Sequence, residues 1–106
     1  MYYFAYGSNM DQAQMTERCP GAVLVGNAIL RGYRLAFTIF SKKRNCGCAD
    51  IVISSEDQVH GLLYRVTTKE REALDRFEGH PIHYKQIPVT VDTPMGEVSA
   101  FSYEVV

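Results

Sequence analysis

The sequence has no apolar run near the length of about 20 residues that a membrane-spanning helix needs. It also lacks the basic and long apolar segments of a secretory signal, because Met1-Tyr2-Tyr3-Phe4-Ala5 already has the composition of a strand. Its three cysteines are an odd number, which disfavours a disulfide framework and favours free thiols in a reducing compartment. These absences predict no membrane partner and a cytoplasmic location.

The chain has no excess of charge of either sign, with 11 Lys and Arg against 12 Asp and Glu. Binding to a polyanion is therefore not expected, and we predict no nucleic-acid partner. The one basic cluster, Lys42-Lys43-Arg44, is short and typical of a solvated loop. Repeats, low-complexity stretches and shifts in composition are also absent, so the 106 residues are predicted to form a single domain over residues 1–106.

Turn residues divide the chain into short strands and two helices. One helix is predicted from Gln12 to Arg18 after a cap at Asp11. The other runs from Thr68 to about Glu78, where Thr67 and Glu70 form a capping-box pattern and Gly79 ends the helix. The predicted strands are Tyr2 to Ala5, Ala22 to Leu30, Tyr33 to Phe40, Ala49 to Ser54, Val59 to Val66, Tyr84 to Val91, and Glu97 to Val105. This pattern indicates an α+β domain in which a curled sheet can close into a small barrel around a pocket.

The turn Tyr6-Gly7-Ser8-Asn9 lies directly between a predicted buried strand and a capped helix. Backbone N–H groups in such a turn are unpaired, so they can converge on a carboxylate or a developing oxyanion. Gly7 allows the backbone to approach a ligand closely, and Ser8 and Asn9 add a hydroxyl and an amide. The same residues are also common in an ordinary connection between a strand and a helix, so their composition alone leaves both interpretations open.

Glu78 lies four positions after Leu74 and next to Phe77, on the helix face that carries apolar residues. We therefore expect its carboxylate to be partly desolvated, and it also lies in the last turn, where the helix dipole is negative. Both effects raise the pKa of a carboxyl group, which suits it to proton transfer near neutral pH. The alternative is an ordinary glutamate that extends into solvent at the helix end. Glu72 and Asp75 are expected to be charges on the solvent side.

Cys46-Gly47-Cys48, together with His80 and His83, raises the alternative of a metal site. The spacing of the two cysteines is tighter than is usual for zinc ligands, and the histidines follow a turn that ends a helix. We therefore predict no metal, and a module of Cys and His ligands remains an alternative. Ser8 is not part of a nucleophile-elbow motif, and no cysteine has the sequence signature of a nucleophile, so covalent catalysis is not predicted.

Four segments of the chain match motifs that occur together in one known protein family. Tyr3-Phe4-Ala5-Tyr6-Gly7-Ser8-Asn9 resembles the family's Y-F-A-Y-G-S-N signature. Leu74-Asp75-Arg76-Phe77-Glu78-Gly79, with Tyr84 downstream, is similar to its L-D-x-x-E-G segment. Between them, Gly47-Cys48-Ala49-Asp50-Ile51 resembles a G-x-A-D/T-I strand start, and Val59-His60-Gly61-Leu62-Leu63-Tyr64 resembles a V-x-G-x-x-Y strand. The order and approximate spacing of the four segments hold across nearly the whole chain, which therefore resembles the gamma-glutamylcyclotransferase-like family.

This resemblance implies a mixed barrel with flanking helices and a pocket for a small-molecule gamma-glutamyl substrate. The implied reaction is an intramolecular aminolysis that forms 5-oxoproline without a metal or cofactor, with Glu78 as the general acid and base. The implied substrate-binding residues are Tyr3, Phe4, Ala5, Tyr6, Gly7, Ser8, Asn9, Tyr84 and Tyr103. Two questions stay open: whether the chain is instead a catalytically silent member that binds a small carboxylate as a regulatory module, and whether it forms a homodimer.

Overall fold

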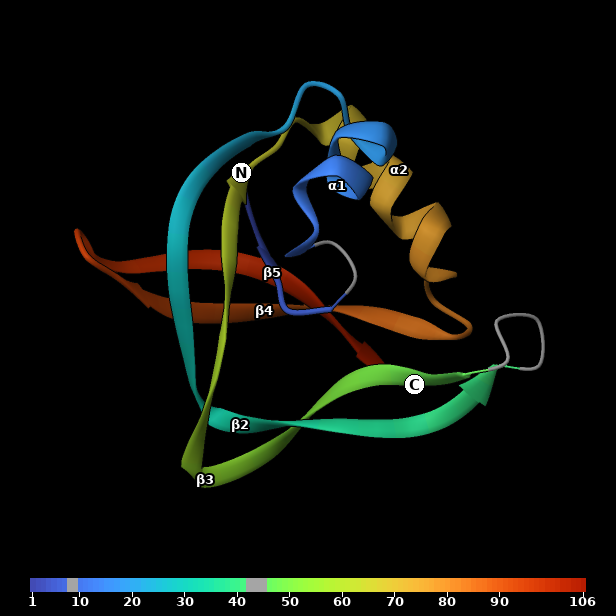
Figure 1. The fold of residues 1–106 in the computed structure, drawn as a ribbon, viewed down its shortest axis with the longest axis vertical. Helices are drawn as coiled ribbons and strands as arrows, with labels where there is room; N and C mark the ends of the chain where they lie inside the picture. The colour runs from blue at the N-terminus through green and yellow to red at the C-terminus, as the bar shows by residue number, and fades with distance from the viewer. Residues whose placement is uncertain (8–9, 42–45) are drawn as a thin grey trace.

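The computed structural model describes the backbone of residues 1–7, 10–41 and 46–106, and the side chains of residues 1–7, 10–36 and 49–106. Two helices and five strands make up this part of the chain (Figure 1). In chain order they are β1 (Tyr2–Ala5), α1 (Gln12–Arg18), β2 (Val23–Ser41), β3 (Cys46–Arg65), α2 (Thr68–Glu78), β4 (Tyr84–Thr93) and β5 (Gly96–Val105). Both helices have the bounds that the sequence predicts.

The strands close into a barrel in the order β1-β3-β2-β4-β5. The barrel is mixed, because β1 pairs antiparallel with β3 but parallel with β5, where Tyr3 lies opposite Phe101. β4 and β5 form an antiparallel hairpin from Tyr84 and Val105 to a tight turn between Thr93 and Gly96. Figure 1 shows α1 and α2 next to each other on one side of the barrel. The predicted α+β fold with a small barrel and flanking helices is therefore confirmed.

The sequence predicts four strands between Ala22 and Val66, and this number is wrong. The first two form the single strand β2, and the last two form the single strand β3. β2 and β3 are long, bent strands that pair with each other from Val23 and Arg65 to Ser41 and Cys46. The pairing register shifts between Arg31 and Tyr33, around Gly32, whose φ of 83° is readily adopted only by glycine. The turn residues Arg31-Gly32 thus mark a bulge that bends β2 and do not end it.

Both ends of α2 are fixed by the residues that the sequence indicates. The Thr67 hydroxyl accepts a hydrogen bond from the Glu70 backbone N–H at 3.3 Å, and the Glu70 carboxylate accepts one from the Thr67 N–H at 2.9 Å. This reciprocal capping box satisfies two backbone groups that a helix start leaves unpaired. At the other end Gly79 takes the left-handed conformation, with φ 68° and ψ 37°. The chain therefore leaves α2 immediately after Glu78.

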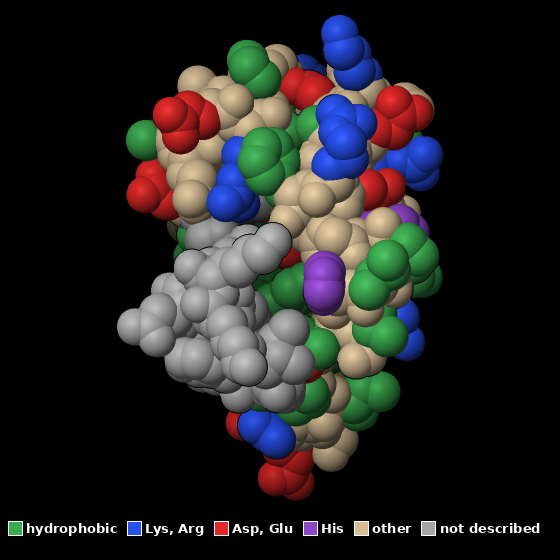
Figure 2. Space-filling model, turned by 90° about the vertical axis from the view of Figure 1, so that its right-hand side faces the viewer, with side chains coloured by type: hydrophobic (Ala, Val, Ile, Leu, Met, Phe, Trp, Pro, Cys, Tyr) green, Lys and Arg blue, Asp and Glu red, His purple; other side chains and the backbone are tan. Residues whose placement is uncertain are grey.

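Charged side chains of both signs are mixed over the helical end of the molecule (Figure 2). Histidine and hydrophobic side chains lie below them on the same face. The mixture agrees with the formal net charge of −1, and it gives no single-sign patch on this face of the kind that binds a polyanion. In the described residues, no helix has both the length and the apolar character that crossing a membrane requires.

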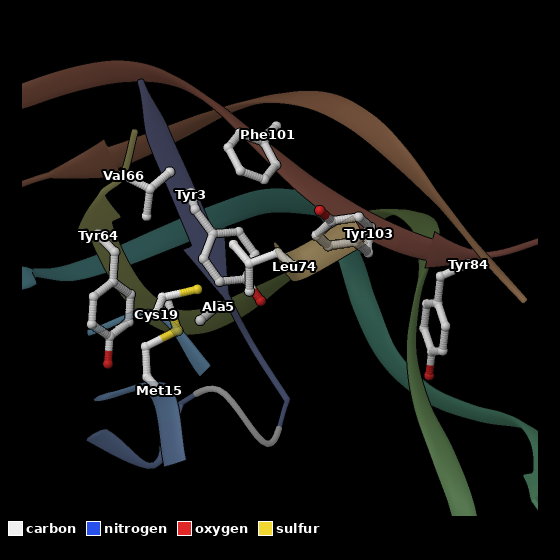
Figure 3. Close-up of a cluster of buried hydrophobic side chains, with 10 residues drawn as sticks. All are labelled: Tyr3, Ala5, Met15, Cys19, Tyr64, Val66, Leu74, Tyr84, Phe101 and Tyr103. Carbon is white, nitrogen blue, oxygen red and sulfur yellow. The ribbon is translucent and has the colours of Figure 1, made fainter. Parts of the chain in front are cut away.

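The side chains of β1 alternate between two hydrophobic clusters, as expected for a strand covered on both faces. Tyr3 and Ala5 belong to the cluster that packs against the helices through Met15 and Leu74. Figure 3 shows this cluster, with Tyr84 at its edge. Phe4 belongs to the second cluster, which is built from strand residues and therefore fills the barrel interior. The sequence prediction that Tyr2 to Ala5 is buried on both faces is confirmed.

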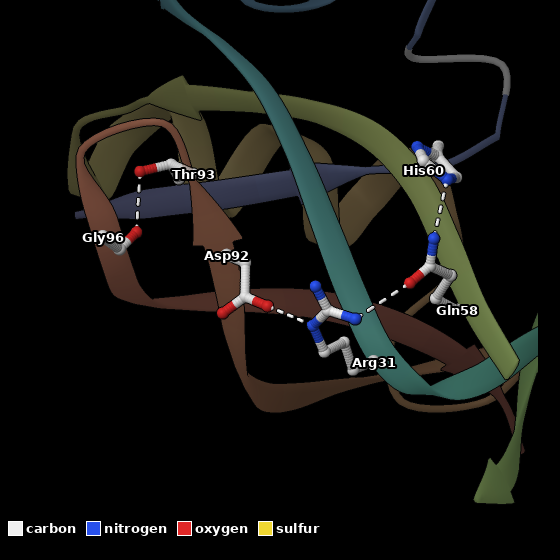
Figure 4. A network of polar contacts seen from close by, with 6 residues as sticks. All are labelled: Arg31, Gln58, His60, Asp92, Thr93 and Gly96. Atoms are coloured by element: carbon white, nitrogen blue, oxygen red, sulfur yellow. Dashed lines mark hydrogen bonds and ion pairs between the residues drawn. The ribbon is translucent and has the colours of Figure 1, made fainter. Parts of the chain in front are cut away.

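Polar contacts reinforce the seam between β2 and β4, where Ile29 lies opposite Asp92. The Arg31 guanidinium forms an ion pair with the Asp92 carboxylate and donates a hydrogen bond to the Gln58 side chain at 3.1 Å (Figure 4). In the adjoining hairpin the Thr93 hydroxyl donates to the Gly96 carbonyl at 2.7 Å. The two contacts of Arg31 join β2 to the neighbouring strands on both sides. The barrel is therefore held closed at this seam by side chains as well as by backbone pairing.

Candidate active site

The turn after β1 leaves the barrel wall at Gly7, whose carbonyl accepts a hydrogen bond from the Met10 N–H at 3.0 Å. The Asp11 carboxylate then caps α1 by accepting from the backbone N–H groups of Ala13 and Gln14. Gly7 lies against Ala49 of β3, since a Cβ added at Gly7 would be 3.6 Å from the Ala49 Cβ. Ser8 and Asn9 are outside the described residues, so their predicted contact with substrate stays a prediction.

Tyr3, Phe4 and Ala5 lie within β1, and at most 4% of each is exposed. Their side chains form parts of the two hydrophobic clusters. Any contact of these three residues with a ligand is therefore expected to involve the backbone. The neighbouring Gly61 of β3 shows how closely this region is packed, since a Cβ there would lie 2.3 Å from the Ala5 carbonyl oxygen.

Tyr6 is the first residue beyond β1, and its hydroxyl donates a hydrogen bond of 2.5 Å to the Tyr103 carbonyl on β5. Burial is the main cause that raises the pKa of the Tyr6 hydroxyl well above its ordinary value. The nearby Tyr84, Asp50 and Glu78 raise this pKa further, in that order. The Tyr6 hydroxyl therefore stays protonated throughout the neutral range and remains a hydrogen-bond donor.

Glu78 is the last residue of α2 and is half-buried, in agreement with the predicted partial desolvation. Its charge is one of those that raise the pKa of Tyr6, so the fold brings this carboxylate close to the residue that begins the turn. Phe77, by contrast, is 49% exposed. The Arg18 guanidinium carbon lies over the Phe77 ring, 4.9 Å from the ring centre. Glu78 is thus more enclosed than its apolar neighbour, and the alternative of a glutamate extending freely into solvent is disfavoured.

The two tyrosines of the C-terminal hairpin both use their hydroxyls inside the protein. The Tyr84 hydroxyl donates to the Ala49 carbonyl at 2.5 Å, and the Tyr103 hydroxyl donates to the Asp75 carboxylate at 2.6 Å. Tyr103 is 2% exposed and Tyr84 is 8% exposed. These contacts hold β4 against β3, and β5 against α2. The two side chains are therefore fixed in the fold, while their predicted contact with substrate remains untested.

Two acidic residues near the site were not singled out by the sequence. Asp75 was expected on the solvent side, but it is half-buried, and its carboxylate accepts hydrogen bonds from Tyr103 and from the Gln86 side chain at 3.1 Å. The spacing of three between Asp75 and Glu78 places them on one helix face, which is the signal that could have indicated this. Asp50 is 4% exposed, and only its place in a predicted strand indicated that it could be buried.

The histidines and cysteines of the alternative metal site are not brought together in the described part of the chain. His80 and His83 are exposed, and the His80 Nδ1 accepts a hydrogen bond from the Gln86 N–H at 3.1 Å. Cys46 and Cys48 lie outside the residues whose side chains are described. Among the described side chains, no three His, Cys, Asp or Glu residues form a group that could hold a metal ion.

The convergence of Tyr6, Glu78, Asp50 and Tyr84 defines what this region can do chemically. The half-buried Glu78 carboxylate provides a proton acceptor, while the neutral Tyr6 hydroxyl is held by the Tyr103 carbonyl. Backbone groups of the turn at Gly7 lie close by, because Gly7 contacts Ala49 and the Ala49 carbonyl binds Tyr84. Proton transfer on a small bound molecule is the chemistry that such an arrangement supports, and the described residues supply it without a protein nucleophile.

Comparison with known proteins identifies relatives of this chain. The family described as "Gamma-glutamyl cyclotransferase, AIG2-like" matches residues 3–105. The chain is 34% identical to the gamma-glutamylcyclotransferase of Bos taurus over an alignment of 108 positions. This alignment covers 96% of this chain and 57% of the bovine protein. The gamma-glutamylcyclotransferase of Mus musculus is 35% identical, with 95% of this chain and 57% of that protein covered. The chain thus spans little more than half the length of these relatives.

Solved structures extend the similarity to the fold. A structure of a gamma-glutamyl cyclotransferase superposes with a TM-score of 0.93 at 30% identity, covering 100% of this chain and 66% of that one. The crystal structure of YkqA from Bacillus subtilis gives a TM-score of 0.84 at 27% identity, covering 100% of this chain and 40% of that one. With the sequence match over residues 3–105, these similarities show that the chain belongs to the gamma-glutamyl cyclotransferase, AIG2-like family.

Proposed function

We propose that this chain is a gamma-glutamyl cyclotransferase that releases 5-oxoproline from a gamma-glutamyl amine or gamma-glutamyl amino acid. The observation that carries the proposal is the position of Glu78, half-buried at the end of α2 and close enough to Tyr6 for its charge to raise the pKa of that hydroxyl. Membership of the family supports the reaction type. The position of Glu78 supports the assignment of the proton-transfer step to this residue.

In the proposed reaction the α-amine of the substrate attacks its own γ-carbonyl carbon. Glu78 removes a proton from the α-ammonium, the new C–N bond closes the five-membered ring, and the carbonyl oxygen becomes an oxyanion. Backbone N–H groups of the turn are the donors that stabilise this oxyanion in the proposed reaction. When the tetrahedral intermediate collapses, the bond to the leaving nitrogen breaks and Glu78 returns the proton to that nitrogen. The Glu78 carboxylate then takes the second proton of the former ammonium from the ring nitrogen and passes it to the released amine. The products are 5-oxoproline and a free amine or amino acid.

Positioning also contributes to the proposed reaction, because the ring closes only when the substrate is held in a bent, near-attack conformation. Residues proposed to contact the substrate are themselves fixed by hydrogen bonds, from Tyr84 to Ala49 and from Tyr6 to Tyr103. Rigid binding residues of this kind lower the entropic part of the barrier without any covalent intermediate. The leaving group is then the variable part of the substrate.

The test is to incubate the protein with a panel of gamma-glutamyl amines and gamma-glutamyl amino acids and to measure 5-oxoproline. We expect Glu78→Gln to lower kcat by about a hundredfold or more, because it removes the general acid and base. Glu72→Gln is the matched control, since Glu72 lies on the same helix but is exposed, and it should retain full activity.

Two results would contradict the proposal. One is activity of the Glu78→Gln variant equal to that of the unmodified chain, which would remove Glu78 from the mechanism. The other is the absence of 5-oxoproline with every compound of the panel. If these compounds raise the melting temperature without being turned over, the chain is a silent member that binds a small carboxylate ligand.

A further inference from the structure

A second pocket lies apart from the candidate active site. Its volume is about 560 Å³, within the range of about 300 to 1,000 Å³ that small-molecule sites have. Its lining comes from β2, β3 and the hairpin of β4 and β5, together with Met10. None of the described residues that line it belongs to the group of Tyr6, Asp50, Glu78 and Tyr84. The pocket is therefore a separate candidate for binding a small molecule.

Strand register places three side chains of this pocket in one row. Ile29 of β2 lies opposite Asp92 of β4 and opposite His60 of β3. The neighbours of Ile29 along β2, Ala28 and Leu30, are buried in the barrel interior, so Ile29 points outward. Side chains directly opposite one another share a face of the sheet. The row thus crosses the outer face of the barrel, with an apolar side chain between an acid and an imidazole.

Figure 4 shows a chain of polar contacts that runs from Asp92 through Arg31 and Gln58 to His60. The Arg31 Nε pairs with Asp92 Oδ2, and its Nη1 donates to Gln58 Oε1 at 3.1 Å. The Gln58 amide nitrogen lies 3.1 Å from His60 Nε2. Because Arg31 can only donate, Gln58 Oε1 accepts and its amide nitrogen donates to His60. The neutral His60 ring therefore carries its hydrogen on Nδ1.

Three atoms of this chain of contacts keep hydrogen-bonding capacity. In the described part of the protein, Arg31 Nη2 and His60 Nδ1 donate to no acceptor, and Asp92 Oδ1 accepts from no donor. The side chains of Arg31 and Asp92 are 66% and 37% exposed, so the ion pair is open to solvent. The pocket thus offers two donors and one anionic acceptor that a ligand can use without breaking the ion pair.

The charges of the lining indicate the class of ligand. Arg31 and Asp92 cancel each other, so a zwitterion, which places an opposite charge against each of them, is the complementary ligand. Two strand spacings put Asp92 and His60 about 10 Å apart. After a hydrogen bond of about 3 Å at each end, about 4 Å is left between the cationic and anionic groups of the ligand. This short separation suits an ammonium and a carboxylate carried by one carbon atom.

We propose that this pocket binds a free α-amino acid with an apolar side chain. The ammonium of the ligand donates to Asp92 Oδ1, and its carboxylate accepts from Arg31 Nη2 and His60 Nδ1. The apolar side chain of the ligand contacts Ile29 and Met10, which also line the pocket. This binding site goes beyond the proposed reaction, because it uses none of the residues assigned to proton transfer.

The test measures by calorimetry the binding of L-leucine and of two analogues that each lack one charged group. Isocaproic acid lacks the ammonium, and isoamylamine lacks the carboxylate. We expect each analogue to bind the unmodified chain about tenfold more weakly than leucine. Asp92→Asn keeps an oxygen acceptor for Arg31 but removes the charge. This change should reduce the preference for leucine over isocaproic acid by about tenfold.

Two further variants show where leucine binds. Glu104→Gln is the matched control, because Glu104 also forms a partly exposed ion pair, with Lys85, at the other end of the same hairpin. It should leave the three affinities unchanged. Glu78→Gln should also leave the affinity for leucine unchanged, because Glu78 does not line the pocket.

Each other result overturns the inference. If leucine does not bind, the pocket holds only solvent. If either analogue binds the unmodified chain as tightly as leucine, the charged group that it lacks is not recognised, and this comparison needs no variant that has to fold. If Asp92→Asn and Glu104→Gln change the preference alike, or if Glu78→Gln abolishes binding, leucine occupies another site.

Discussion

The Asp75 side chain connects α2 to both strands of the C-terminal hairpin. Its Oδ1 accepts hydrogen bonds from the Tyr103 hydroxyl of β5 at 2.6 Å and from the Gln86 amide of β4 at 3.1 Å. Glu78 lies three residues further along the same helix. Because one turn of helix is stiff, fixing Asp75 also limits the movement of Glu78. Asp75 and its two partners are therefore positioning residues for the proposed proton transfer.

This arrangement predicts a measurable role for one hydroxyl group. Tyr103→Phe removes the donor to Asp75 while keeping the ring, and we expect the free energy of unfolding at neutral pH to fall by about 1.5 to 3 kcal/mol. We also expect a lower kcat with a smaller change in KM, because the position of Glu78 is less well fixed while the binding turn is intact. Urea denaturation and steady-state kinetics measure the two effects.

Tyr33→Phe is the matched control for that change. Tyr33 is half-buried and packs against the barrel interior cluster, but it lies on β2, away from α2. Its loss of a hydroxyl should leave kcat unchanged. If Tyr103→Phe and Tyr33→Phe alter kcat to the same extent, the contact between Tyr103 and Asp75 has no positioning role.

The sequence predicted some of these residues and missed others for a physical reason. Glu78 and Tyr6 were identified because each lies in a local pattern, a helix end and a glycine turn. The importance of Asp75 and Asp50 depends on partners far along the chain, namely Tyr103 and Val105. Such partners are brought near only when the barrel closes. Helix periodicity and strand alternation carry no information about which distant backbone or hydroxyl group will meet a carboxylate.

α2 is the element whose stability matters most to the candidate site, since it carries both Asp75 and Glu78. Its start depends on the reciprocal bonds between Thr67 and Glu70. We predict that Thr67→Ala lowers the free energy of unfolding by about 1 kcal/mol, because the Glu70 N–H loses its acceptor. Thr67→Ser retains a hydroxyl at the cap and should restore most of the loss. Both values are obtained from urea denaturation curves.

The neighbouring Thr68→Ala change is the control for the cap. Thr68 is exposed and is the first residue inside the helix, where its side chain has no capping role. Its replacement should change the free energy of unfolding by less than about 0.5 kcal/mol. A loss at Thr68 as large as that at Thr67 would show that general helix propensity, and not the capping box, is being measured.

At the level of elements, the helices were predicted with correct bounds and the long strands were not. A helix start and end are encoded by residues within one turn, such as Thr67, Glu70 and Gly79. The continuity of β2 across Gly32 depends instead on pairing with β3 on the other side of a bulge. A glycine or an acidic pair therefore looks the same in the sequence whether the strand ends there or bends.

The closed barrel, seen as a whole, buries tyrosine hydroxyls that an unfolded chain exposes to water. Burial is the main cause that raises the pKa of Tyr103 above its ordinary value, and the hydrogen bond to Asp75 adds to the effect. Burial also raises the pKa of Tyr6, where the charges of Asp50 and Glu78 act in the same direction. The folded protein therefore keeps protons on these hydroxyls at a pH where the unfolded chain has lost them.

This difference in bound protons predicts a loss of stability in alkali. Below about pH 10, the ordinary pKa of tyrosine, both states are protonated and the stabilisation from the buried hydroxyl is fully present. Above it the unfolded state binds fewer protons than the folded state, so the free energy of unfolding falls as the pH rises toward the higher folded pKa. For the 2% exposed Tyr103, the fall is about 1.4 kcal/mol per pH unit.

The decline is measured by urea denaturation at several values between about pH 9 and about pH 11. Other groups also titrate there, so the informative quantity is the difference between the unmodified chain and Tyr103→Phe. Phenylalanine does not ionise in either state, and the variant should therefore lose stability less steeply, by about 1.4 kcal/mol per pH unit above pH 10. Tyr103→Phe is thus expected to be the less stable protein at neutral pH but to lose that disadvantage in alkali. Parallel curves for the two proteins would show that Tyr103 ionises equally in both states, and that barrel closure does not hold its proton.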